Sequence, residues 1–444
     1  MTQTNRRPHI IVFSISGLNT LWLGCYGNTS VSTPGLDRLA LRSVVFDQYY
    51  TNTSRADLLY SSFLHGVHPA AVSGQNQTTT SGLLMLNETS SLPSQLAMRG
   101  YRTVFLTDDA PEATGPSEKF FDEVVEIDTK ESSQPVDSYE ETRFCQYFEE
   151  AIRLLSESVE DDASDKPLFL WCRFKGFFGP WDFPQEERLA EQEDEEDPEP
   201  YAGTTVPFSE EKGEVYTKDD YRLHPEMIRD HDAILSYLQA WKAGLAILDT
   251  AMNDFLDFLA EARLDHNAVL VLTSEQGFPL GEHGRVGQAP QAASRLLYPE
   301  EFHCPLMIRL PHFDELAFRT SLLCGPTDLY SILKQFAAEQ NDDITITQTP
   351  FLHAVFDEKE TFHDHLLFVE NDGDSINRCV ITERWLFRQM SLVVAPGKHS
   401  NGVYRGQPVF YEVYTLPDDR FCVNDVVSRT EQEQSELITL LDQV

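Results

Sequence analysis

Long apolar runs are absent from this sequence of 444 residues. No stretch approaches the ~20 consecutive apolar residues that a membrane-spanning helix needs. The first residues, Met-Thr-Gln-Thr-Asn-Arg-Arg-Pro, lead directly into a predicted strand, so the apolar core of a signal peptide is absent as well. We therefore expect a cytoplasmic protein without a membrane partner.

Cysteine is sparse and unpatterned. The 7 cysteines are odd in number and scattered, without a Cys-x-x-Cys pair or a Cys/His cluster. Neither a zinc site nor a disulfide framework is therefore indicated. We expect reduced cysteines that pack as small apolar residues.

Basic residues are few relative to acidic ones. The chain has 34 Lys and Arg against 72 Asp and Glu, which gives a formal net charge of -38. This balance argues against nucleic acid and anionic membranes as partners. Solubility, or adaptation to a salty milieu, is the simplest reason for the charge, and a basic partner protein is the alternative, for which no residue stands out.

Short apolar segments alternate with amphipathic ones over the first three quarters of the chain. The segment His-Ile-Ile-Val-Phe-Ser-Ile at 9–15 is typical of a parallel strand that is covered on both faces. The alternation predicts a mostly parallel α/β sheet, in which ligands bind at the carboxyl ends of the strands. Further strands are predicted at 101–106, 166–174, 268–273 and 306–310, and helices at 33–40, 56–64, 92–99, 234–262 and 327–337.

The pattern changes after about residue 347. Closely spaced short strands and a final helix over 431–444 predict a small antiparallel sheet closed by that helix. We predict an α/β domain over 1–347 and this smaller unit over 348–444. The acidic run at about 186–200, which includes Glu-Gln-Glu-Asp-Glu-Glu-Asp, is predicted to be a solvated, partly disordered insertion.

Several motifs occur in a consistent order along the chain. They are Leu-Gly-Cys-Tyr-Gly (23–27), Thr-Pro-Gly-Leu-Asp-Arg-Leu-Ala (33–40), Gly-Tyr-Arg-Thr (100–103), Leu-Gly-Glu-His-Gly (280–284) and Cys-Pro-Leu-Met-Ile-Arg-Leu-Pro (304–311). The set resembles the sulfatase family of the alkaline-phosphatase superfamily. The resemblance implies a three-layer α/β sandwich with a mostly parallel central sheet, plus a small C-terminal α+β domain with an antiparallel sheet.

The resemblance also implies a chemistry with four requirements. A Cys or Ser in a Cys/Ser-x-Pro-x-Arg motif is oxidised to formylglycine, whose hydrated aldehyde attacks sulfur. A calcium or similar hard cation on carboxylate and amide oxygens polarises the sulfate. Lys and His side chains neutralise the sulfate oxygens and protonate the leaving group. A pocket accepts the alcohol.

The metal-ligand positions that the resemblance implies carry few carboxylates. The family's Asp-Asp pair after the first strand falls on Ser16 and Gly17, and its later Asp-Asn/His pair falls on Glu275 and Gln276. A hard dication usually needs more than one carboxylate. We therefore predict no cofactor, and Ca²⁺ in an altered site is the alternative.

The nucleophile position can be aligned in two ways. The gapless register places Ala56 at the nucleophile and Tyr60 at the Arg of the motif. Alanine has no atom that can become an aldehyde or attack sulfur. An alternative register on Thr-Ser-Arg-Ala (53–56) places Thr51 at the nucleophile but breaks the spacing to the motifs that follow. Ser54 is a further hydroxyl in this stretch, without the motif that should follow it.

The positions that would hold the sulfate are altered as well. The family's Lys and His residues fall on Asp108, Ala110, Phe178 and Gln288. Two adjacent carboxylates, Asp108 and Asp109, are expected to repel a sulfate rather than neutralise it.

Two features near these positions allow a structural or a functional reading. Glu282 and His283 survive from the family motif, and such a pair on a loop is more often a structural hydrogen-bonding unit. The aromatic residues Phe177, Phe178 and Trp181 either line a pocket for a sugar or fill space that charged groups have left.

These substitutions predict a catalytically inactive pseudo-sulfatase that binds an unknown ligand or protein partner. One alternative is a divergent sulfuric or phosphoric ester hydrolase with a remodelled metal site and a hydroxyl nucleophile in the stretch 51–54. Another alternative is an assembly or structural protein. All three hypotheses rest on the resemblance of fold and on the substitution of the residues that the family chemistry requires.

Overall fold

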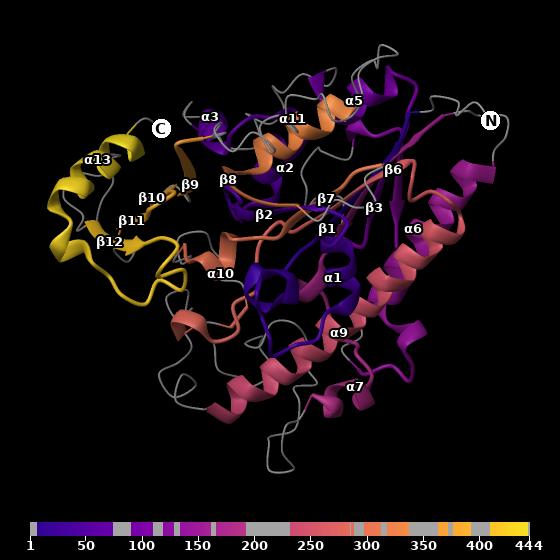
Figure 1. Cartoon of the computed structure of the whole chain (residues 1–444), viewed down its shortest axis with the longest axis horizontal. Coiled ribbons are helices and arrows are strands. Elements are labelled where there is room, and N and C mark those ends of the chain that lie inside the picture. Colours follow the sequence, from indigo (N-terminus) through magenta and orange to yellow (C-terminus); the bar gives the residue numbers. More distant parts are fainter. Residues whose placement is uncertain are drawn as a thin grey trace, which may run out of the picture.

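An eight-stranded sheet organises the first three quarters of the chain (Figure 1). The strand order is β4-β3-β5-β1-β6-β7-β2-β8, and β7 is antiparallel to both of its neighbours, whereas the other pairs are parallel. The strands are β1 (His9–Ile15), β2 (Val44–Tyr49), β3 (Arg102–Thr107), β4 (Glu123–Glu126), β5 (Leu168–Phe174), β6 (Ala268–Thr273), β7 (Leu306–Arg309) and β8 (Phe318–Cys324). The computed structural model describes residues 7–73, 90–109, 119–127, 134–160, 166–191, 231–284, 286–287, 297–311, 318–336, 363–371, 376–391 and 409–442.

The central strand β1 packs against helices on both sides of the sheet. Its alternate residues Phe13 and Ile15 join one core with helices α1, α6 and α9, whereas Ile10 and Val12 join the other with α2, α5 and α11. All four side chains are fully buried, as the continuous apolar pattern predicts. The helices are α1 (Pro34–Ala40), α2 (Ala56–His65), α5 (Leu92–Ala97), α6 (Arg143–Glu160), α9 (His231–Glu261) and α11 (Pro326–Phe336). The predicted three-layer sandwich is confirmed.

A second, antiparallel sheet lies beside this body at the C-terminal end of the chain (Figure 1, yellow). One face packs on the main body through a cluster that includes Phe302 and Phe368, and the other face packs on α13 through Val380 and Leu437. Its strands and helix are β9 (His365–Asn371), β10 (Ile376–Thr382), β11 (Trp385–Ser391), β12 (Val409–Thr415) and α13 (Glu431–Leu441). The predicted C-terminal α+β unit is confirmed, whereas the proposed boundary at 347/348 lies outside the described residues.

The structure also contains elements that the sequence pattern did not predict. Helix α6 and strand β8 were missed, and the smaller helices α3 (Pro69–Ser73), α7 (Gln185–Ala190) and α10 (Pro299–Phe302) were not predicted either. Residues 186–190 of the predicted acidic insertion at about 186–200 belong to α7. Arg188 on that helix is fully buried and donates to backbone carbonyls of Trp181 and Phe183. Residues 192–230 lie outside the described part.

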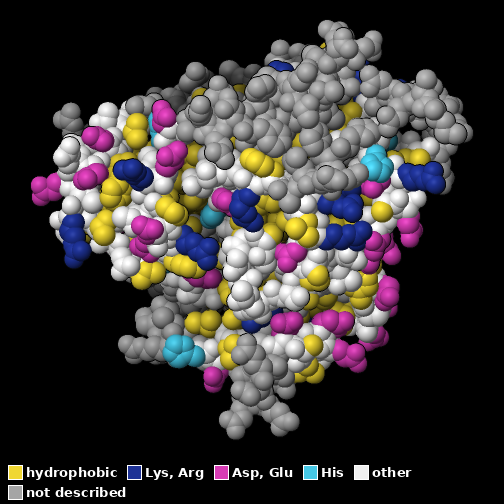
Figure 2. All heavy atoms as spheres, viewed as in Figure 1, with side chains coloured by type: hydrophobic (Ala, Val, Ile, Leu, Met, Phe, Trp, Pro, Cys, Tyr) yellow, Lys and Arg dark blue, Asp and Glu magenta, His cyan; other side chains and the backbone are white. Residues whose placement is uncertain are grey.

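The surface carries charges of both signs. On the face drawn in Figure 2, Lys and Arg side chains are interspersed with Asp and Glu side chains, and acidic side chains follow the right-hand edge. Among the helices that the structure describes, none is both long and apolar enough to cross a membrane.

Candidate functional site

The carboxyl ends of β1, β3, β5 and β6 meet at one edge of the main sheet, which we call the carboxyl edge. Ser16 and Gly17 follow β1, Asp108 follows β3, Phe178 follows β5, and Glu275 follows β6. The fold therefore brings together positions that the sequence places far apart, where an open α/β sheet holds its ligands.

Gly17 has no room for a side chain. Its φ of +89° is a left-handed conformation, and a Cβ atom there would lie 2.6 Å from the Cβ of Phe177. The Gly17 amide donates to the carbonyl oxygen of Gln276 at 2.8 Å, which holds Gly17 against the loop after β6. Ser16 is buried beside it, and its carbonyl oxygen accepts from the Phe177 amide at 2.9 Å. A carboxylate cannot be accommodated at position 17 in this backbone.

Glu275 is bound by a guanidinium group from β5, which lies on the other side of β1. Arg173 on β5 donates through Nε to Oε1 at 2.8 Å and through Nη2 to Oε2 at 3.3 Å. Tyr60 on α2 donates its hydroxyl to the same Oε1 at 2.9 Å and accepts from Trp171 Nε1 at 3.1 Å. Burial and the nearby carboxylate raise the pKa of Tyr60 well above its usual value, so the phenol remains a donor.

The ion pair extends into a chain of alternating charges. Arg173 Nη1 donates to Asp109 at 2.7 Å, and the ammonium of Lys175 lies 3.1 Å from the other oxygen of Asp109. Burial opposes ionisation of Asp109, but the hydrogen bonds and charges of Arg173 and Lys175 hold its pKa below the usual value. The two carboxylates and the two cations of this chain therefore balance one another.

Asp108 forms a second buried ion pair. Its Oδ2 accepts from Arg143 Nη2 at 2.6 Å and also from the hydroxyl of Tyr147. Its Oδ1 accepts from the Lys175 amide at 2.8 Å. Each of the two carboxylates that the sequence analysis expects to repel a sulfate is thus paired with an arginine.

The nucleophile stretch lies where β2 leads into α2. Ala56 is the first residue of α2 and contributes only a methyl group. Thr51 is buried, and its hydroxyl lies 3.4 Å from the carbonyl oxygen of Phe302. The Ser54 hydroxyl and amide both donate to Glu370 of β9, and the Thr53 hydroxyl lies 3.4 Å from the same oxygen. A strand of the C-terminal sheet thus supplies the acceptor for this stretch.

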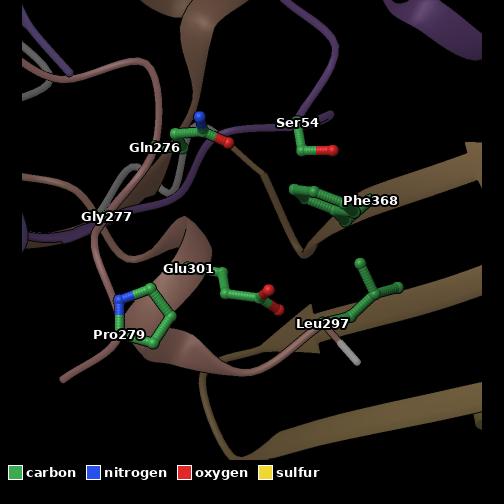
Figure 3. A pocket seen from close by; sticks show the side chains of 7 residues that line it. All are labelled: Ser54, Gln276, Gly277, Pro279, Leu297, Glu301 and Phe368. Carbon is green, nitrogen blue, oxygen red and sulfur yellow. The ribbon is translucent and has the colours of Figure 1, made fainter. Parts of the chain in front are cut away.

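A small pocket lies between Ser54 and the C-terminal sheet (Figure 3). Its volume of about 10 Å³ has room for roughly one water molecule. The side chains of Glu301, Leu297 and Phe368 point into it, and Phe368 comes from β9. The complete lining is Ser54, Gln276, Gly277, Pro279, Leu297, Glu301 and Phe368.

Two of the three aromatic residues after β5 fill the interior. Phe177 and Trp181 are fully buried, and Phe177 stacks on Trp241 of α9 with ring centroids 4.5 Å apart. Phe178 is half-buried, and the centroid of its ring lies 5.2 Å from that of Phe278. Of the remaining predicted clamp positions, Ala110 and Gln288 lie outside the described residues.

Glu282 and His283 lie away from the carboxyl-edge network. Glu282 accepts from the Leu280 amide at 2.5 Å within its own loop. His283 Nδ1 lies 2.7 Å from Glu300, and its Nε2 lies 3.2 Å from the carbonyl oxygen of Cys422. Both residues are thus engaged in contacts with the protein itself.

Several residues of the site were missed in the sequence. Arg173 lies near the end of a strand that is otherwise apolar, and Lys175 directly follows that strand. Glu370 lies in a strand that was read only as part of a small sheet. A charged residue within a buried apolar run was the available signal, because such residues are rarely buried without a partner. Among the described residues, no group of three or more His, Cys, Asp and Glu side chains is arranged to hold a metal ion.

Comparison with known proteins agrees with the fold and its motifs. The family model described as Sulfatase matches residues 8–314, which is more than half of the chain. The chain belongs to the sulfatase family. Its membership accounts for the preserved order of scaffold motifs, but family membership by itself does not establish an activity.

Curated relatives share part of this sulfatase-family chain. Mouse (Mus musculus) iduronate 2-sulfatase is 26% identical over 302 residues, which cover 59% of this chain and 53% of that protein. Human (Homo sapiens) arylsulfatase H is 38% identical over 108 residues, which cover 22% of this chain and 19% of that protein. The chain thus spans about half the length, or less, of these relatives.

Solved structures cover the chain more fully at lower identity. The structure of BT4656 in complex with its substrate D-Glucosamine-2-N, 6-O-disulfate has a TM-score of 0.67 at 16% identity and covers 99% of this chain and 97% of that one. The phosphonate monoester hydrolase of Agrobacterium radiobacter has a TM-score of 0.65 at 15% identity, with 98% and 96% covered. At these identities the likeness establishes the fold alone.

Proposed function

We propose that this sulfatase-family chain is a pseudo-sulfatase that does not hydrolyse sulfate esters and acts by binding a ligand or a partner protein. The observation that carries the proposal is the ion pair between Arg173 and Glu275. Glu275 is the one carboxylate among the four implied metal-ligand positions, and a guanidinium neutralises it from within the protein.

The donor set does not fit a divalent cation. Calcium takes 6–8 oxygen ligands, several of them usually carboxylates. Gly17 offers no side chain and no room for one, whereas Glu275 already accepts from Arg173 and Tyr60. A cation at Glu275 would have to displace the guanidinium, which would leave buried Arg173 with Asp109 as its one remaining carboxylate in this chain of charges.

The surroundings of α2 support the gapless register of the nucleophile motif. In that register Tyr60 replaces the arginine of the motif, and Tyr60 lies one turn after Ala56 and contacts Glu275. In the alternative register the arginine would be Arg55, which instead pairs with Asp57 at 2.5 Å. With Ala56 at the nucleophile position, the chain has no atom there for the first step of the family chemistry.

Charge and space near this position also oppose a sulfate ester. Glu370 places a carboxylate that is 1% exposed beside Thr53 and Ser54, and a sulfate close to it would be repelled. The adjoining pocket of about 10 Å³ holds roughly one water molecule. The retained scaffold with a filled site supports a role in which the protein surface binds rather than one in which the site catalyses.

A second candidate, a divergent ester hydrolase, is favoured by one observation. The Ser54 hydroxyl donates to Glu370, and a hydroxyl next to a carboxylate is the arrangement of a nucleophile and its base. This candidate needs no cysteine and would use a sulfuric or phosphoric ester.

Two measurements on the purified full-length protein separate the candidates. The first is the content of calcium, magnesium and manganese by elemental analysis after dialysis against metal-free buffer. The second is hydrolysis of an aryl sulfate and an aryl phosphate, with each cation added, for wild type and for the triple variant Thr51→Ala, Thr53→Ala, Ser54→Ala. An active sulfatase serves as the positive control.

If the protein is a pseudo-sulfatase, we expect much less than one equivalent of metal and a hydrolysis rate of wild type no higher than that of the triple variant. About one equivalent of a divalent cation, together with hydrolysis that the triple variant loses, would replace it with the hydrolase candidate. Hydrolysis that the triple variant retains would also overturn it and would place the nucleophile elsewhere.

A further inference from the structure

His283 lies at the contact between the main body and the C-terminal sheet. It belongs to the loop after β6, while the two groups that it touches come from different parts of the chain. Nδ1 is 2.7 Å from Oε1 of Glu300 on α10, and Nε2 is 3.2 Å from the carbonyl oxygen of Cys422, in the segment after β12. The imidazole therefore links the two units through one side chain.

The geometry of these two contacts selects a protonation state. A carboxylate oxygen and a carbonyl oxygen are both acceptors, so each needs an N–H from the ring. Only the doubly protonated imidazolium donates at both nitrogens. A neutral ring keeps one N–H, and its other nitrogen would face either Glu300 or the carbonyl of Cys422 with a lone pair.

The ring is held in place by stacking. It lies on Tyr298 with centroids 3.4 Å apart and planes 6° apart. The guanidinium of Arg388 from β11 lies 3.7 Å from the centroid of the Tyr298 ring and pairs with Glu412 of β12 at 2.6 Å. The backbone φ of +51° at His283 is a strained conformation for a residue with a side chain.

Charged groups of both signs face the imidazole. Burial and the positive charge of Arg388 oppose its protonation, whereas Glu300 and the carbonyl of Cys422 favour it, and the net effect raises the pKa of His283 above 6.5. Glu282, in the same loop, is half-buried, and desolvation together with the negative charge of Glu300 raises its pKa. The other titratable groups around the contact are the ring of Tyr298, the pair of Glu412 and Tyr414, and the buried thiol of Cys422.

We propose that His283 is a pH-responsive clasp, which in its protonated form holds the segment after β12 against the main body and in its neutral form releases it. The His283 clasp is a conformational device of the fold, and it does not depend on whether the protein is an enzyme. Leu297, which lines the pocket of Figure 3, directly precedes Tyr298, so release would loosen the wall of that pocket.

The sign of the pH effect follows from the raised pKa. A histidine whose folded-state pKa exceeds its unfolded value of about 6.5 contributes full stability below that unfolded value. The contribution is lost as the pH rises through the folded-state pKa. We therefore expect the clasp to close at acidic to neutral pH and to loosen at alkaline pH.

Hydrogen exchange of the full chain tests the clasp. Protection factors of amides in residues 416–425 are measured between about pH 6 and pH 9 for wild type, His283→Gln and the control His266→Gln, whose side chain is 52% exposed. In wild type and the control we expect protection to fall about 2- to 10-fold with rising pH, the value of one net hydrogen bond. In His283→Gln the protection should not change with pH, because glutamine does not titrate.

A second variant keeps the test decisive if His283→Gln does not fold. Glu300→Gln retains an oxygen acceptor but removes the charge, so the midpoint of the protection change should move to lower pH. The NMR signal of His283 is assigned as the histidine signal that is absent in His283→Gln or that shifts in Glu300→Gln. In wild type this signal should titrate with a pKa above 6.5. Titration below 6.5, or an unchanged midpoint in Glu300→Gln, would overturn the proposal.

Discussion

Arg173 Nε lies 2.8 Å from Oε1 of Glu275, and each of these two side chains is 6% exposed. The pair joins the ends of β5 and β6, the two strands that flank β1. At the carboxyl edge of this sulfatase-family fold, a side-chain cation of the protein therefore pairs with a side-chain anion of the protein. A buried pair of this kind is strongly coupled, so removing one partner is much more costly than removing both.

Removing the guanidinium should destabilise the protein. We expect Arg173→Met to lower the free energy of unfolding by about 3–5 kcal/mol, because Glu275 would remain buried without its cation. The double variant Arg173→Met, Glu275→Gln should recover most of that loss. Urea denaturation measures all the variants, and Arg153→Met is the control, because it removes an exposed arginine that pairs with Glu150 and should cost about 1 kcal/mol or less. A loss of stability in the double variant that equals the sum of the losses in Arg173→Met and Glu275→Gln would contradict the coupling.

Adding one methyl group at position 17 should test how closely Phe177 approaches. We expect Gly17→Ala to cost about 2–5 kcal/mol, the sum of left-handed backbone strain and overpacking. Gly27→Ala is the matched control, since Gly27 has a φ of +98° and nothing within 4 Å of its added Cβ. The control should cost only the strain of about 1–2 kcal/mol. Equal losses in thermal or urea unfolding would mean that position 17 has free space.

Glu370 should matter for the docking of the C-terminal sheet on the stretch before α2. It accepts from the amide and the hydroxyl of Ser54. Glu370→Ala should cost about 1.5–3 kcal/mol, the range for hydrogen bonds to a charged group. The exposed Glu383→Ala should change stability by about 0.5 kcal/mol or less. If the two substitutions have equal effects on urea unfolding, Glu370 does not hold the sheet.

His303 should make the protein less stable in acid. Burial lowers its pKa to about 4, and Nε2 lies 2.8 Å from the carbonyl oxygen of Asp47. Between about pH 6.5 and pH 4 the unfolded histidine binds a proton that the folded one does not, so stability falls as the pH falls.

The test of His303 compares variants rather than absolute stabilities. Between pH 7 and pH 4, the free energy of unfolding of wild type should fall by about 2–3 kcal/mol more than that of His303→Gln. The exposed His266→Gln should follow wild type. Parallel pH profiles of wild type and His303→Gln would show that His303 is not the group responsible.

Local patterns in the sequence were sufficient to predict the fold and the edge that holds the site. Burial selects apolar residues, so the apolar run of β1 and the alternation of strand and helix patterns are visible within each segment's own sequence. The ordered motifs were sufficient for the family, and they located Ser16, Gly17 and Glu275 at that edge. Helix α6 and strand β8 were missed although their patterns are local.

The chemistry of the site was decided by the tertiary structure. Arg173 and Tyr60 contact Glu275 from positions 102 and 215 residues away in the sequence, and Glu370 reaches Ser54 across 316 residues. The sequence alone therefore suggested that Asp108 and Asp109 repel anions, whereas folding pairs each carboxylate with an arginine. An apolar pattern among neighbouring residues indicates which segments are buried. Which charge it meets there depends on how distant strands are ordered in the sheet, because ion pairs form only at distances of a few ångströms.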